Sequence, residues 1–289
     1  MQLGLVGIGR MGASMRERLR EAGHEVVGYD RDPKLSDVAG PAELVAALAP
    51  PRVVWLMVPA AATAAVIEDL VGSLAPGDLV VDGGNSRYSE AGPRARKLAA
   101  AGVGFLDVGV SGGVWGREDG FALMVGGDER HVRRCMPIFE ALKPPGETGF
   151  VHAGGVGAGH YAKMVHNGIE YGLMQAYAEG YELLLRAGEV TDVPGVIRSW
   201  RAGSVVRSWL LDLLDRALTE DPGLESLRGY VEDTGEGRWT LEEAIKLAVP
   251  MPVTAASLFA RFASREEDSP TMRAVAALRA QFGGHAVRH

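Results

Sequence analysis

An apolar run over residues 2–8 leads directly into the glycine pattern Gly7-x-Gly9-x-x-Gly12. A helical pattern follows, and a second apolar run over residues 25–29 ends at Asp30. A glycine pattern by itself is weak evidence, but the full order of strand, glycine turn, helix, strand and acid is typical of dinucleotide-binding folds. The beginning of the chain is therefore expected to form such a fold.

Each residue of this turn has an expected task. Gly7 permits the tight turn, Gly9 lets the backbone approach a pyrophosphate, and Gly12 lets the helix pack closely on the strand. The helix N-terminus then offers N–H groups and positive partial charge to the phosphates. The Asp30 carboxylate accepts hydrogen bonds from ribose hydroxyls and repels a 2′-phosphate, which predicts NAD as the cofactor. Arg31 beside it is able to pair with such a phosphate, so NADP stays an alternative.

Strand and helix patterns alternate as far as residue 152. Strands are expected at 53–58, 79–82, 104–108, 121–125 and 148–152, with helices at 60–73, 89–101 and 128–142. Such alternation predicts an α/β fold, with an N-terminal Rossmann-type, doubly wound and mostly parallel sheet. Ligands bind such sheets at the carboxyl ends of the strands, where two glycine-rich loops are expected, at 83–86 and 109–113.

The pattern becomes helical from residue 157. One long helix is expected over 157–187, with shorter ones around 193–202, 205–218, 224–231, 240–248, 253–263 and 270–281. The sequence thus predicts a dinucleotide-binding Rossmann domain over residues 1–156. It predicts an all-helical substrate-binding and oligomerisation domain over residues 157–289.

Composition and charge exclude several other classes of protein. The 289 residues carry a net charge of −7, which argues against a nucleic-acid-binding protein. The one cysteine, Cys135, allows no intramolecular disulfide and fits a reducing cytoplasm. The first residues lack the pattern of a signal peptide. The most apolar run, 53–67, is interrupted by Pro59 and is shorter than the about 18 residues of a membrane helix. A cytoplasmic protein without a membrane partner is expected.

The expected long helix carries a polar stripe of Lys163, His166, Asn167, Glu170 and Tyr171. This spacing places all of them on one helix face. A solvent face is usually built from paired Lys, Glu, Arg and Gln, whereas this face offers an acid–base pair and several hydrogen-bonding groups. From residue types alone, a solvent face and a ligand-binding face are equally good interpretations.

Two glycines interrupt the same helix pattern. Gly168 and Gly172 weaken a helix by roughly 1 kcal/mol each relative to alanine. They make sense if some other group must come close to the helix backbone.

The run over residues 159–171 resembles the 6-phosphogluconate dehydrogenases, within the β-hydroxyacid dehydrogenase superfamily. The wider superfamily generally keeps only a lysine and an asparagine four residues later, so His166, Glu170 and Tyr171 indicate the phosphogluconate branch. Further matches are Gly83-Gly84-Asn85-Ser86, Val110-Ser111-Gly112-Gly113, Gly237-Arg238-Trp239-Thr240, Phe259-Ala260-Arg261 and Arg279-x-x-Phe282-Gly283-x-His285. The length resembles that of the short bacterial form.

The resemblance implies oxidative decarboxylation of 6-phosphogluconate to ribulose 5-phosphate and CO2, with hydride transfer to NAD. Lys163 would be the general base at the C3 hydroxyl, and Glu170 would protonate C1 of the enediol. Lys163 must be neutral to act in this way. No metal is implied, because a β-keto acid needs only a cation near its carbonyl oxygen to lose CO2.

The resemblance also implies binding roles. The substrate's carboxylate and hydroxyls would be held by Asn85, Ser111, Gly112, Gly113, His166 and Asn167. Its phosphate would be held by Tyr171 and Arg261, with Arg279 and His285 reaching in from a neighbouring subunit. The cofactor would be held at Gly7, Gly9, Met11, Gly12, Asp30, Arg31, Val58, Pro59, Ala60 and Asn85. A homodimer or homotetramer with composite active sites would follow.

Departures from the family pattern bear on the phosphate. Long forms have Lys-Gly-Thr-Gly-Lys-Trp where this chain has residues 234–239, so the phosphate site is expected to depend more on Arg261 and Arg279. Val114-Trp115 replaces two acidic residues of long forms. Two alternatives stay open: a non-decarboxylating dehydrogenase of a small 3-hydroxy acid, and a catalytically silent NAD-binding regulator.

Overall fold

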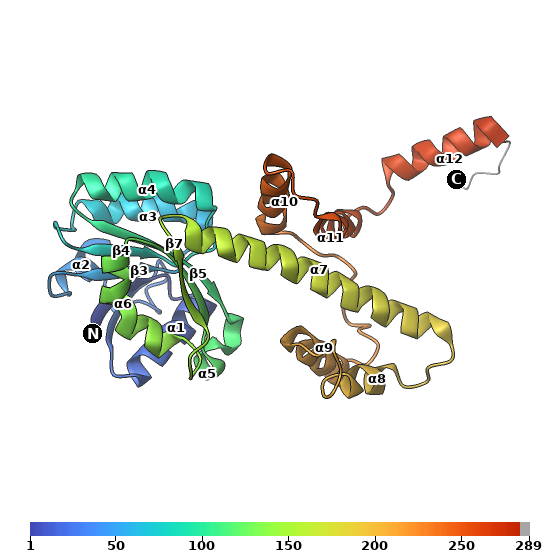
Figure 1. Ribbon diagram of the computed structural model, residues 1–289, viewed down its shortest axis with the longest axis horizontal. Coiled ribbons are helices and arrows are strands. Elements are labelled where there is room, and N and C mark those ends of the chain that lie inside the picture. The colour runs from blue at the N-terminus through green and yellow to red at the C-terminus, as the bar shows by residue number, and fades with distance from the viewer. Residues whose placement is uncertain (284–289) are drawn as a thin grey trace. The chain divides into compact units, whose positions relative to one another are not determined.

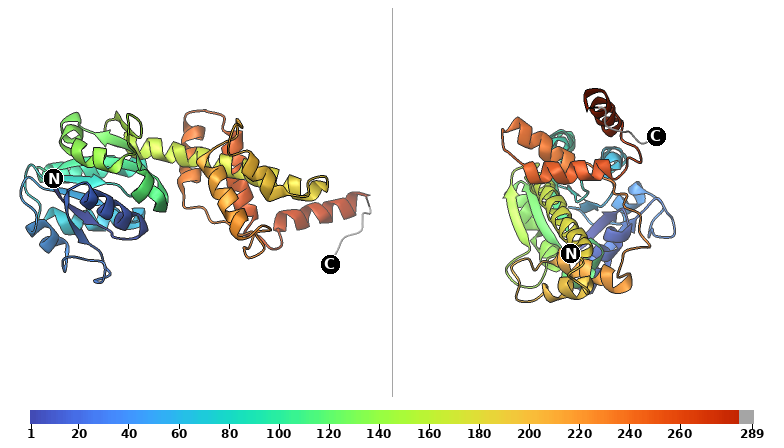
Figure 2. Two further views of the ribbon diagram at one scale, coloured as in Figure 1. Left: turned by 90° about the horizontal axis from the view of Figure 1, so that it is seen from below. Right: turned by 90° about the vertical axis from the view of Figure 1, so that its right-hand side faces the viewer.

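The structure is a computed structural model that describes residues 1–283 (Figure 1). It divides into two compact units, Met1–His166 and Asn167–His289. The division falls inside helix α7 (Ala158–Ala187), which is one unbroken helix (Figure 2). The domain boundary expected near residue 157 stays a prediction.

The first unit is built on a sheet with the strand order β2-β1-β3-β4-β5-β6-β7. The strands are β1 (Gln2–Val6), β2 (Glu25–Tyr29), β3 (Val53–Leu56), β4 (Leu79–Asp82), β5 (Gly104–Ser111), β6 (Ala122–Gly127) and β7 (Phe150–Gly154). Neighbouring strands are parallel except β5 and β6, which are antiparallel. Strand β1 lies between β2 and β3, so the strand order reverses there, as at the ligand-binding edge of other doubly wound sheets. The predicted fold class is confirmed.

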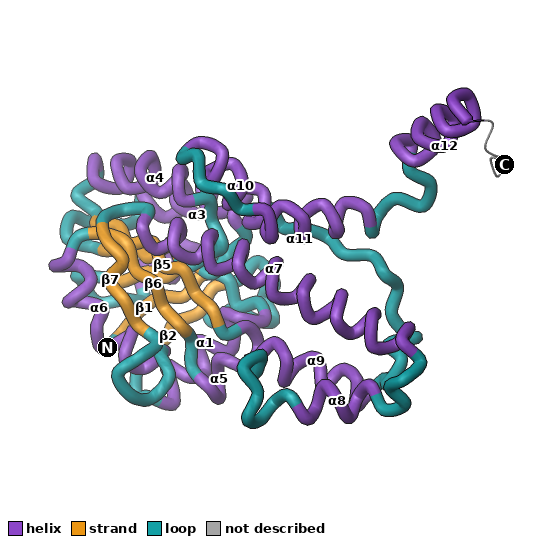
Figure 3. Tube along the Cα trace, turned by 45° about the vertical axis from the view of Figure 1, so that its right-hand side comes forward, coloured by secondary structure: helices purple, strands orange, loops and turns teal. Residues whose placement is uncertain are grey.

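Helices cover both faces of this sheet (Figure 3). They are α1 (Arg10–Glu21), α2 (Pro41–Ala46), α3 (Ala60–Val71), α4 (Tyr88–Ala100), α5 (Gly116–Asp119) and α6 (Glu129–Leu142). Successive strand residues point to opposite faces, so Trp55 packs in the layer of α1 and α6, whereas Leu56 packs in the layer of α2, α3 and α4. Burial on both faces explains why the central strands β3 and β4 begin as continuous apolar runs.

The second unit contains helices joined by turns and loops, with no strand among its described residues, 167–283. Beyond α7 it contains α8 (Val193–Ser199), α9 (Trp209–Glu220), α10 (Glu236–Lys246), α11 (Pro252–Ala263) and α12 (Pro270–Gly283). A small apolar core forms around Ile197, Leu211 and Leu218, with Tyr177 and Tyr181 of α7 packed against it. The predicted all-helical second half is confirmed.

The prediction of a helix around residues 224–231 is wrong. This segment forms turns, because the Asp221 carboxylate accepts hydrogen bonds from the Ser226 N–H at 2.9 Å and from the Ser226 hydroxyl at 2.7 Å. Leu224 adopts a φ of 52°, which is outside the right-handed helical region.

The loop expected at 109–113 is a loop only in its last part. Strand β5 continues through Ser111, because β6 returns antiparallel and pairs Val110 with Leu123 and Ser111 with Ala122. The turn then forms at Gly112 and Gly113, whose φ values are 146° and 55°. Sequence periodicity did not distinguish this extension from a loop, because the pairing partners, Ala122 and Leu123, lie on a later strand.

Candidate active site

The glycine turn after β1 has the geometry that a pyrophosphate needs. Gly7 has a φ of 92°, and a Cβ there would lie 2.6 Å from the carbonyl oxygen of Met57. A Cβ on Gly12 would lie 1.9 Å from the carbonyl oxygen of Gly7, so only glycine lets α1 pack this closely. At Gly9, the N-cap of α1, a Cβ would meet no atom within 4 Å. The backbone at Gly9 and the start of α1 are therefore accessible to a phosphate group.

Asp30 lies beside this turn and is hydrogen-bonded to it. Its Oδ2 accepts a hydrogen bond from the Ile8 N–H at 2.7 Å, and its Oδ1 accepts one from the Asp32 N–H at 2.9 Å. Each carboxylate oxygen can accept a further bond, so ribose hydroxyls can still bind there. The side chain of Arg31 is exposed. The residues present fit a dinucleotide whose ribose carries free hydroxyls.

Further expected cofactor residues follow β3. Val58 and Pro59 precede α3, whose first residue is Ala60. A Cβ on Gly84 would lie 2.6 Å from the Val58 carbonyl oxygen, so the loop after β4 packs directly on the loop after β3. Met11, on the first turn of α1, packs against the core of the sheet. These positions all belong to the carboxyl edge near the point where the strand order reverses.

Strand β5 anchors the start of α7 through a buried carboxylate that the sequence did not reveal. Asp107 is fully buried, and its Oδ1 and Oδ2 accept hydrogen bonds from the N–H groups of Gly157 at 2.6 Å and His160 at 2.9 Å. These groups lie at the start of the helix, where the first N–H groups have no carbonyl partner within the helix itself. A negative charge at this end also favours the helix dipole. Asp107 therefore fixes where α7 begins.

Two residues further along β5, the strand presses directly on α7. A Cβ on Gly109 would lie 2.5 Å from Cβ of Lys163 and 2.8 Å from the carbonyl oxygen of Gly159. A Cβ on Gly159 would in turn lie 2.4 Å from the carbonyl oxygen of Met124 in β6. The helix backbone thus rests on the sheet without intervening side chains. This close contact sets the position from which Lys163 extends.

The next residue on the same face of β5 reaches the polar stripe. Ser111 Oγ lies 3.3 Å from Nε2 of His166, and Nδ1 of His166 lies 3.2 Å from Nζ of Lys163. Asp107, Gly109 and Ser111 alternate along the strand and therefore share one face. The structure brings together three predicted site residues in one hydrogen-bonded chain of hydroxyl, imidazole and amine.

The remaining predicted residues of the first unit lie in glycine-rich turns. Asn85 is exposed in the loop after β4, between buried Gly84 and buried Ser86. A Cβ on Gly113 would meet no atom within 4 Å, whereas one on Gly112 would lie 3.0 Å from the carbonyl oxygen of Gly120. Asn85 and the Gly113 backbone are accessible for polar contacts with a ligand.

The polar stripe continues in the second unit. Asn167 is buried and Glu170 is half-buried. A Cβ on Gly168 would lie 2.7 Å from Cγ2 of Thr240, and one on Gly172 would lie 3.0 Å from Val253 Cγ1. The groups that approach the helix backbone at these two glycines are side chains of α10 and α11, and the expected close approach is explained by packing.

Among the predicted phosphate residues, Tyr171 and Arg261 are in direct contact. Cζ of Arg261 lies 3.4 Å from the centre of the Tyr171 ring, in a cation–π arrangement. Nη1 of Arg261 also donates to the carbonyl oxygen of Glu232 at 3.1 Å. The Tyr171 hydroxyl accepts a hydrogen bond from the Thr234 N–H at 3.5 Å. The segment that departs from the long-form pattern therefore lies beside the phenol of Tyr171.

A second arginine cluster lies in the same segment. The buried Asp233 carboxylate accepts hydrogen bonds from Arg238 Nε at 2.7 Å and Nη2 at 3.1 Å, and Arg265 Nη1 lies 3.3 Å from it. Hydrogen bonding from Arg238, with the charges of Arg238 and Arg265, outweighs burial and lowers the pKa of Asp233. Both guanidinium groups lie over the Phe262 ring, at 4.4 and 5.2 Å. Asp233 was not predicted, since a lone aspartate in a polar segment carries no pattern.

The predicted tail residues are only partly described. Arg279 is exposed on α12. His285 lies outside the described residues. Within residues 1–283, no group of three or more His, Cys, Asp and Glu side chains is arranged to hold a metal ion. In the same part of the chain, no helix combines the length and apolar character needed to cross a membrane.

The doubly wound sheet with its glycine turn, followed by a helical unit, defines an oxidoreductase of the dinucleotide-binding class. A family model described as the NAD binding domain of 6-phosphogluconate dehydrogenase matches residues 2–147. A second, described as the C-terminal domain of 6-phosphogluconate dehydrogenase, matches residues 159–285. The chain belongs to the 6-phosphogluconate dehydrogenase family, and the expected resemblance is confirmed.

Relatives of two lengths are similar to the chain. A protein from Haloferax volcanii, named an NAD(+)-dependent, decarboxylating 6-phosphogluconate dehydrogenase, is 43% identical, over 99% of this chain and 98% of its own length. A decarboxylating 6-phosphogluconate dehydrogenase from Lactococcus lactis subsp. lactis is 36% identical, over 92% of this chain but 61% of its own length. The chain is therefore similar in full to short relatives and in part to long ones.

Solved structures agree with this assignment. A 6-phosphogluconate dehydrogenase from Plasmodium falciparum aligns with a TM-score of 0.82 and 25% identity, over 100% of this chain and 66% of the solved one. A 3-hydroxyisobutyrate dehydrogenase from Mycobacterium tuberculosis aligns with a TM-score of 0.71 and 23% identity, over 96% of this chain and 99% of the solved one. The second likeness shows the fold alone.

Proposed function

We propose that the chain catalyses the oxidative decarboxylation of 6-phosphogluconate to ribulose 5-phosphate and CO2, with NAD preferred over NADP as the acceptor. The observation that carries the proposal is the hydrogen-bonded chain of Ser111, His166 and Lys163, which places an amine at the carboxyl edge of a dinucleotide-binding sheet. When bound, the nicotinamide supplies the acceptor for the hydride that leaves C3. Family membership supports this substrate.

Lys163 takes the proton of the C3 hydroxyl in its neutral form. The ammonium that results stays beside the ketone oxygen and stabilises the negative charge that develops as CO2 leaves. His166 holds Nζ of Lys163 from one side, and Ser111 in turn fixes the imidazole. The helix thus keeps the amine close to the reacting oxygen in both steps.

Glu170 donates the proton that C1 of the enediol needs to become the product. It lies two helical turns after Lys163 on α7, about 10 Å along the helix axis at 1.5 Å per residue. The spacing of seven residues places both side chains on the same side of the helix. The same helix therefore carries both the base and the acid.

The substrate's polar groups are proposed to bind the residues that the sequence predicted for them. Asn85, Ser111, Gly112, Gly113, His166 and Asn167 bind its carboxylate and hydroxyls, and Tyr171 and Arg261 bind its phosphate. A non-decarboxylating dehydrogenase of a small 3-hydroxy acid is disfavoured, because its substrate gives Arg261 and its stacked Tyr171 no phosphate to bind. A silent regulator is disfavoured because binding alone needs no acid–base pair.

NAD preference rests on Asp30. Its carboxylate is held beside the glycine turn by the Ile8 N–H, where a 2′-phosphate would meet a negative charge. The NAD(+)-dependent relative from Haloferax volcanii supports the same choice.

A homodimer or homotetramer, with Arg279 and His285 completing a neighbour's site, is part of the proposal, and the cytoplasm is its proposed compartment. Helix α12 exposes Met272 by 59%, Val275 by 43% and Leu278 by 69%, at a spacing that places them along one side of the helix. Such an apolar stripe is expected to be covered by a second copy. Mixing the separately inactive Arg279→Ala and Lys163→Met variants should recover activity in hybrid oligomers; no recovery after subunit exchange would contradict composite sites.

The assignment of the acid–base pair is tested with conservative variants. Lys163→Met and Glu170→Gln should each lose turnover severely while NAD still binds, measured by titration of the cofactor. Glu179→Gln is the matched control on the same helix, where the exposed carboxylate accepts a hydrogen bond from Gln175. Full activity in either of the first two variants would refute the assigned role.

A further inference from the structure

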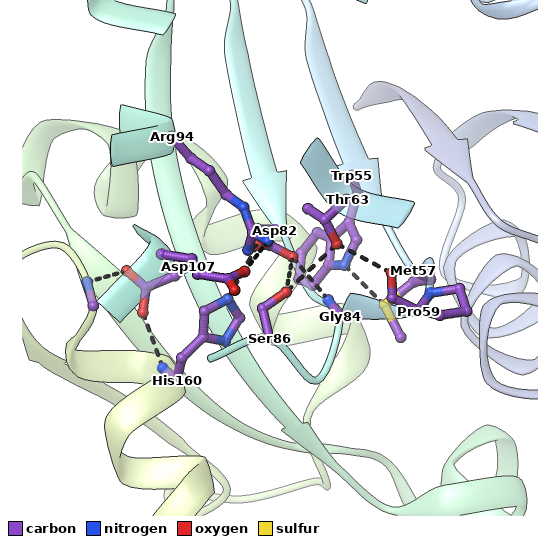
Figure 4. Close-up of polar contacts among 12 residues, drawn as sticks. Trp55, Met57, Pro59, Thr63, Asp82, Gly84, Ser86, Arg94, Asp107 and His160 are labelled. Atoms are coloured by element: carbon purple, nitrogen blue, oxygen red, sulfur yellow. Dashed lines mark hydrogen bonds and ion pairs between the residues drawn. The ribbon is translucent and has the colours of Figure 1, made fainter. Parts of the chain in front are cut away.

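A buried carboxylate at the end of β4 joins three elements of the first unit (Figure 4). Asp82 is fully buried, and its Oδ1 accepts hydrogen bonds from the Gly84 N–H at 3.2 Å and from the Ser86 hydroxyl at 3.4 Å. Its Oδ2 accepts one from Nη1 of Arg94 at 2.9 Å and lies 3.3 Å from Nε2 of His160. The loop after β4, helix α4 and the first turn of α7 thus meet at one side chain.

The charge on Asp82 is maintained by these neighbours. Burial raises the pKa of this carboxyl, but the adjacent His160 side chain, the charge of Arg94 and the Gly84 N–H together outweigh burial and lower the pKa. Removing one partner of such a buried group leaves an uncompensated charge, which is strongly destabilising. Asp82 therefore holds its partners firmly.

His160 connects α7 to two neighbouring strands. Its side chain is buried against Asp82 of β4, and its backbone N–H donates to Asp107 of β5 at 2.9 Å. Its Nε2 lies 3.3 Å from Oδ2 of Asp82 without an aligned hydrogen bond to any described residue. Lys163 follows one helical turn later, and its position depends on how this first turn is seated.

We propose that His160 and Asp82 are positioning residues, which hold the loop carrying Asn85 in register with the helix turn carrying Lys163. The proposal rests on the proposed function, because it explains how two parts of that site keep their spacing. Asn85 is exposed and its loop has no strand partner, whereas its neighbours Gly84 and Ser86 are fixed to Asp82. The imidazole of His160 closes the connection from the loop to the helix.

A positioning role and a packing role for His160 predict different kinetic effects of two substitutions at this residue. His160→Leu fills a similar volume without a polar atom, and His160→Gln keeps an N–H that can reach Asp82. Positioning predicts that kcat with 6-phosphogluconate falls roughly tenfold or more in the Leu variant, with unchanged NAD affinity, and that the Gln variant recovers much of it. His24→Gln is the control, on a histidine that contacts the N-terminal amine.

The second readout does not require activity. Hydrogen exchange of the Gly84 amide, which donates to Asp82, should be faster in His160→Leu and close to wild type in His160→Gln. Equal kcat and equal exchange in the two variants would overturn the proposal. If the Leu variant does not fold, Asp82→Asn serves in its place and should accelerate the same exchange. A wild-type protein without turnover would refute the proposed function, while the exchange measurement would still decide whether His160 holds the loop.

Discussion

The Ser111 hydroxyl lies 3.3 Å from Nε2 of His166, which links the last residue of β5 to the third turn of α7. The same strand holds the start of that helix through Asp107 and presses on it at Gly109. Three alternate residues of β5 therefore contact one helix: Asp107 at its start, Gly109 at its backbone and Ser111 at the side chain of His166. The position of the Lys163 amine therefore depends on the sheet as well as on the helix.

Gly109→Ala should impair turnover through this contact. The new methyl would lie 2.5 Å from Cβ of Lys163, so α7 must shift, at a cost of about 1–3 kcal/mol in unfolding free energy. We expect kcat to fall with little change in NAD affinity, measured by steady-state kinetics and cofactor titration. Gly155→Ala is the control, because a Cβ there meets nothing within 4 Å. Equal kinetics in the two variants would contradict the role of close packing.

Ser111→Ala should weaken substrate binding. The variant removes the hydroxyl beside Nε2 of His166, and a typical hydrogen bond contributes about 0.5–1.5 kcal/mol. We expect the KM for 6-phosphogluconate to rise by roughly two- to twelvefold, while the midpoint of thermal unfolding changes little. Ser199→Ala, which removes a hydroxyl that donates to the Val196 carbonyl, should leave KM unaltered. A KM identical to that of the wild type would argue against Ser111 as a substrate residue.

Asp30→Ser should change cofactor preference. The substitution removes a carboxylate that repels a 2′-phosphate, and it deprives the Ile8 N–H of its acceptor. We expect NAD to bind more weakly and the ratio of NAD to NADP affinity to fall, measured by fluorescence titration of both reduced cofactors. An unchanged ratio would show that Asp30 does not discriminate between the two.

Arg261→Lys should damage phosphate recognition although it preserves the charge. A lysine can neither stack a planar group on Tyr171 nor offer a forked pair of donors. We expect the KM for 6-phosphogluconate to rise, with a much smaller effect on any residual oxidation of unphosphorylated gluconate. Arg228→Lys, at a side chain that is 90% exposed, is the matched control. Equal losses on both substrates would place Arg261 away from the phosphate.

The buried Asp233 predicts an acid-dependent contribution to stability. Its pKa is lowered in the folded state, chiefly by hydrogen bonding from Arg238. Its contribution is therefore complete above the unfolded pKa of about 3.9 and is lost as pH falls through the lower folded value. The difference in unfolding free energy between wild type and Asp233→Asn should shrink below about pH 4, measured by urea unfolding. A difference that grows on acidification would contradict this sign.

The sequence predicted much of the fold because burial on both faces leaves continuous apolar strands and because glycines mark turns with few alternatives. It did not predict the extension of β5 to Ser111, since that depends on pairing with β6. It also predicted a helix at 224–231, where side-chain hydrogen bonds from Ser226 to Asp221 favour turns instead.

The residues of the candidate site were likewise predictable from the sequence only in part. Lys163 and His166 were predictable because their spacing on one helix is local. Asp82, Asp107 and His160 were not assigned a role, because their importance arises from strands and a helix that meet only in the folded chain. A single aspartate at the end of an apolar strand has no sequence pattern that distinguishes an anchor from a turn residue.

The most direct test of the central claim is simultaneous measurement of reduced cofactor and released CO2 when the protein is incubated with 6-phosphogluconate and NAD. The account predicts turnover in which CO2 and NADH are formed in equal amounts. NADH without CO2 would indicate a simple β-hydroxyacid dehydrogenase, and no turnover with either NAD or NADP would contradict the proposed function.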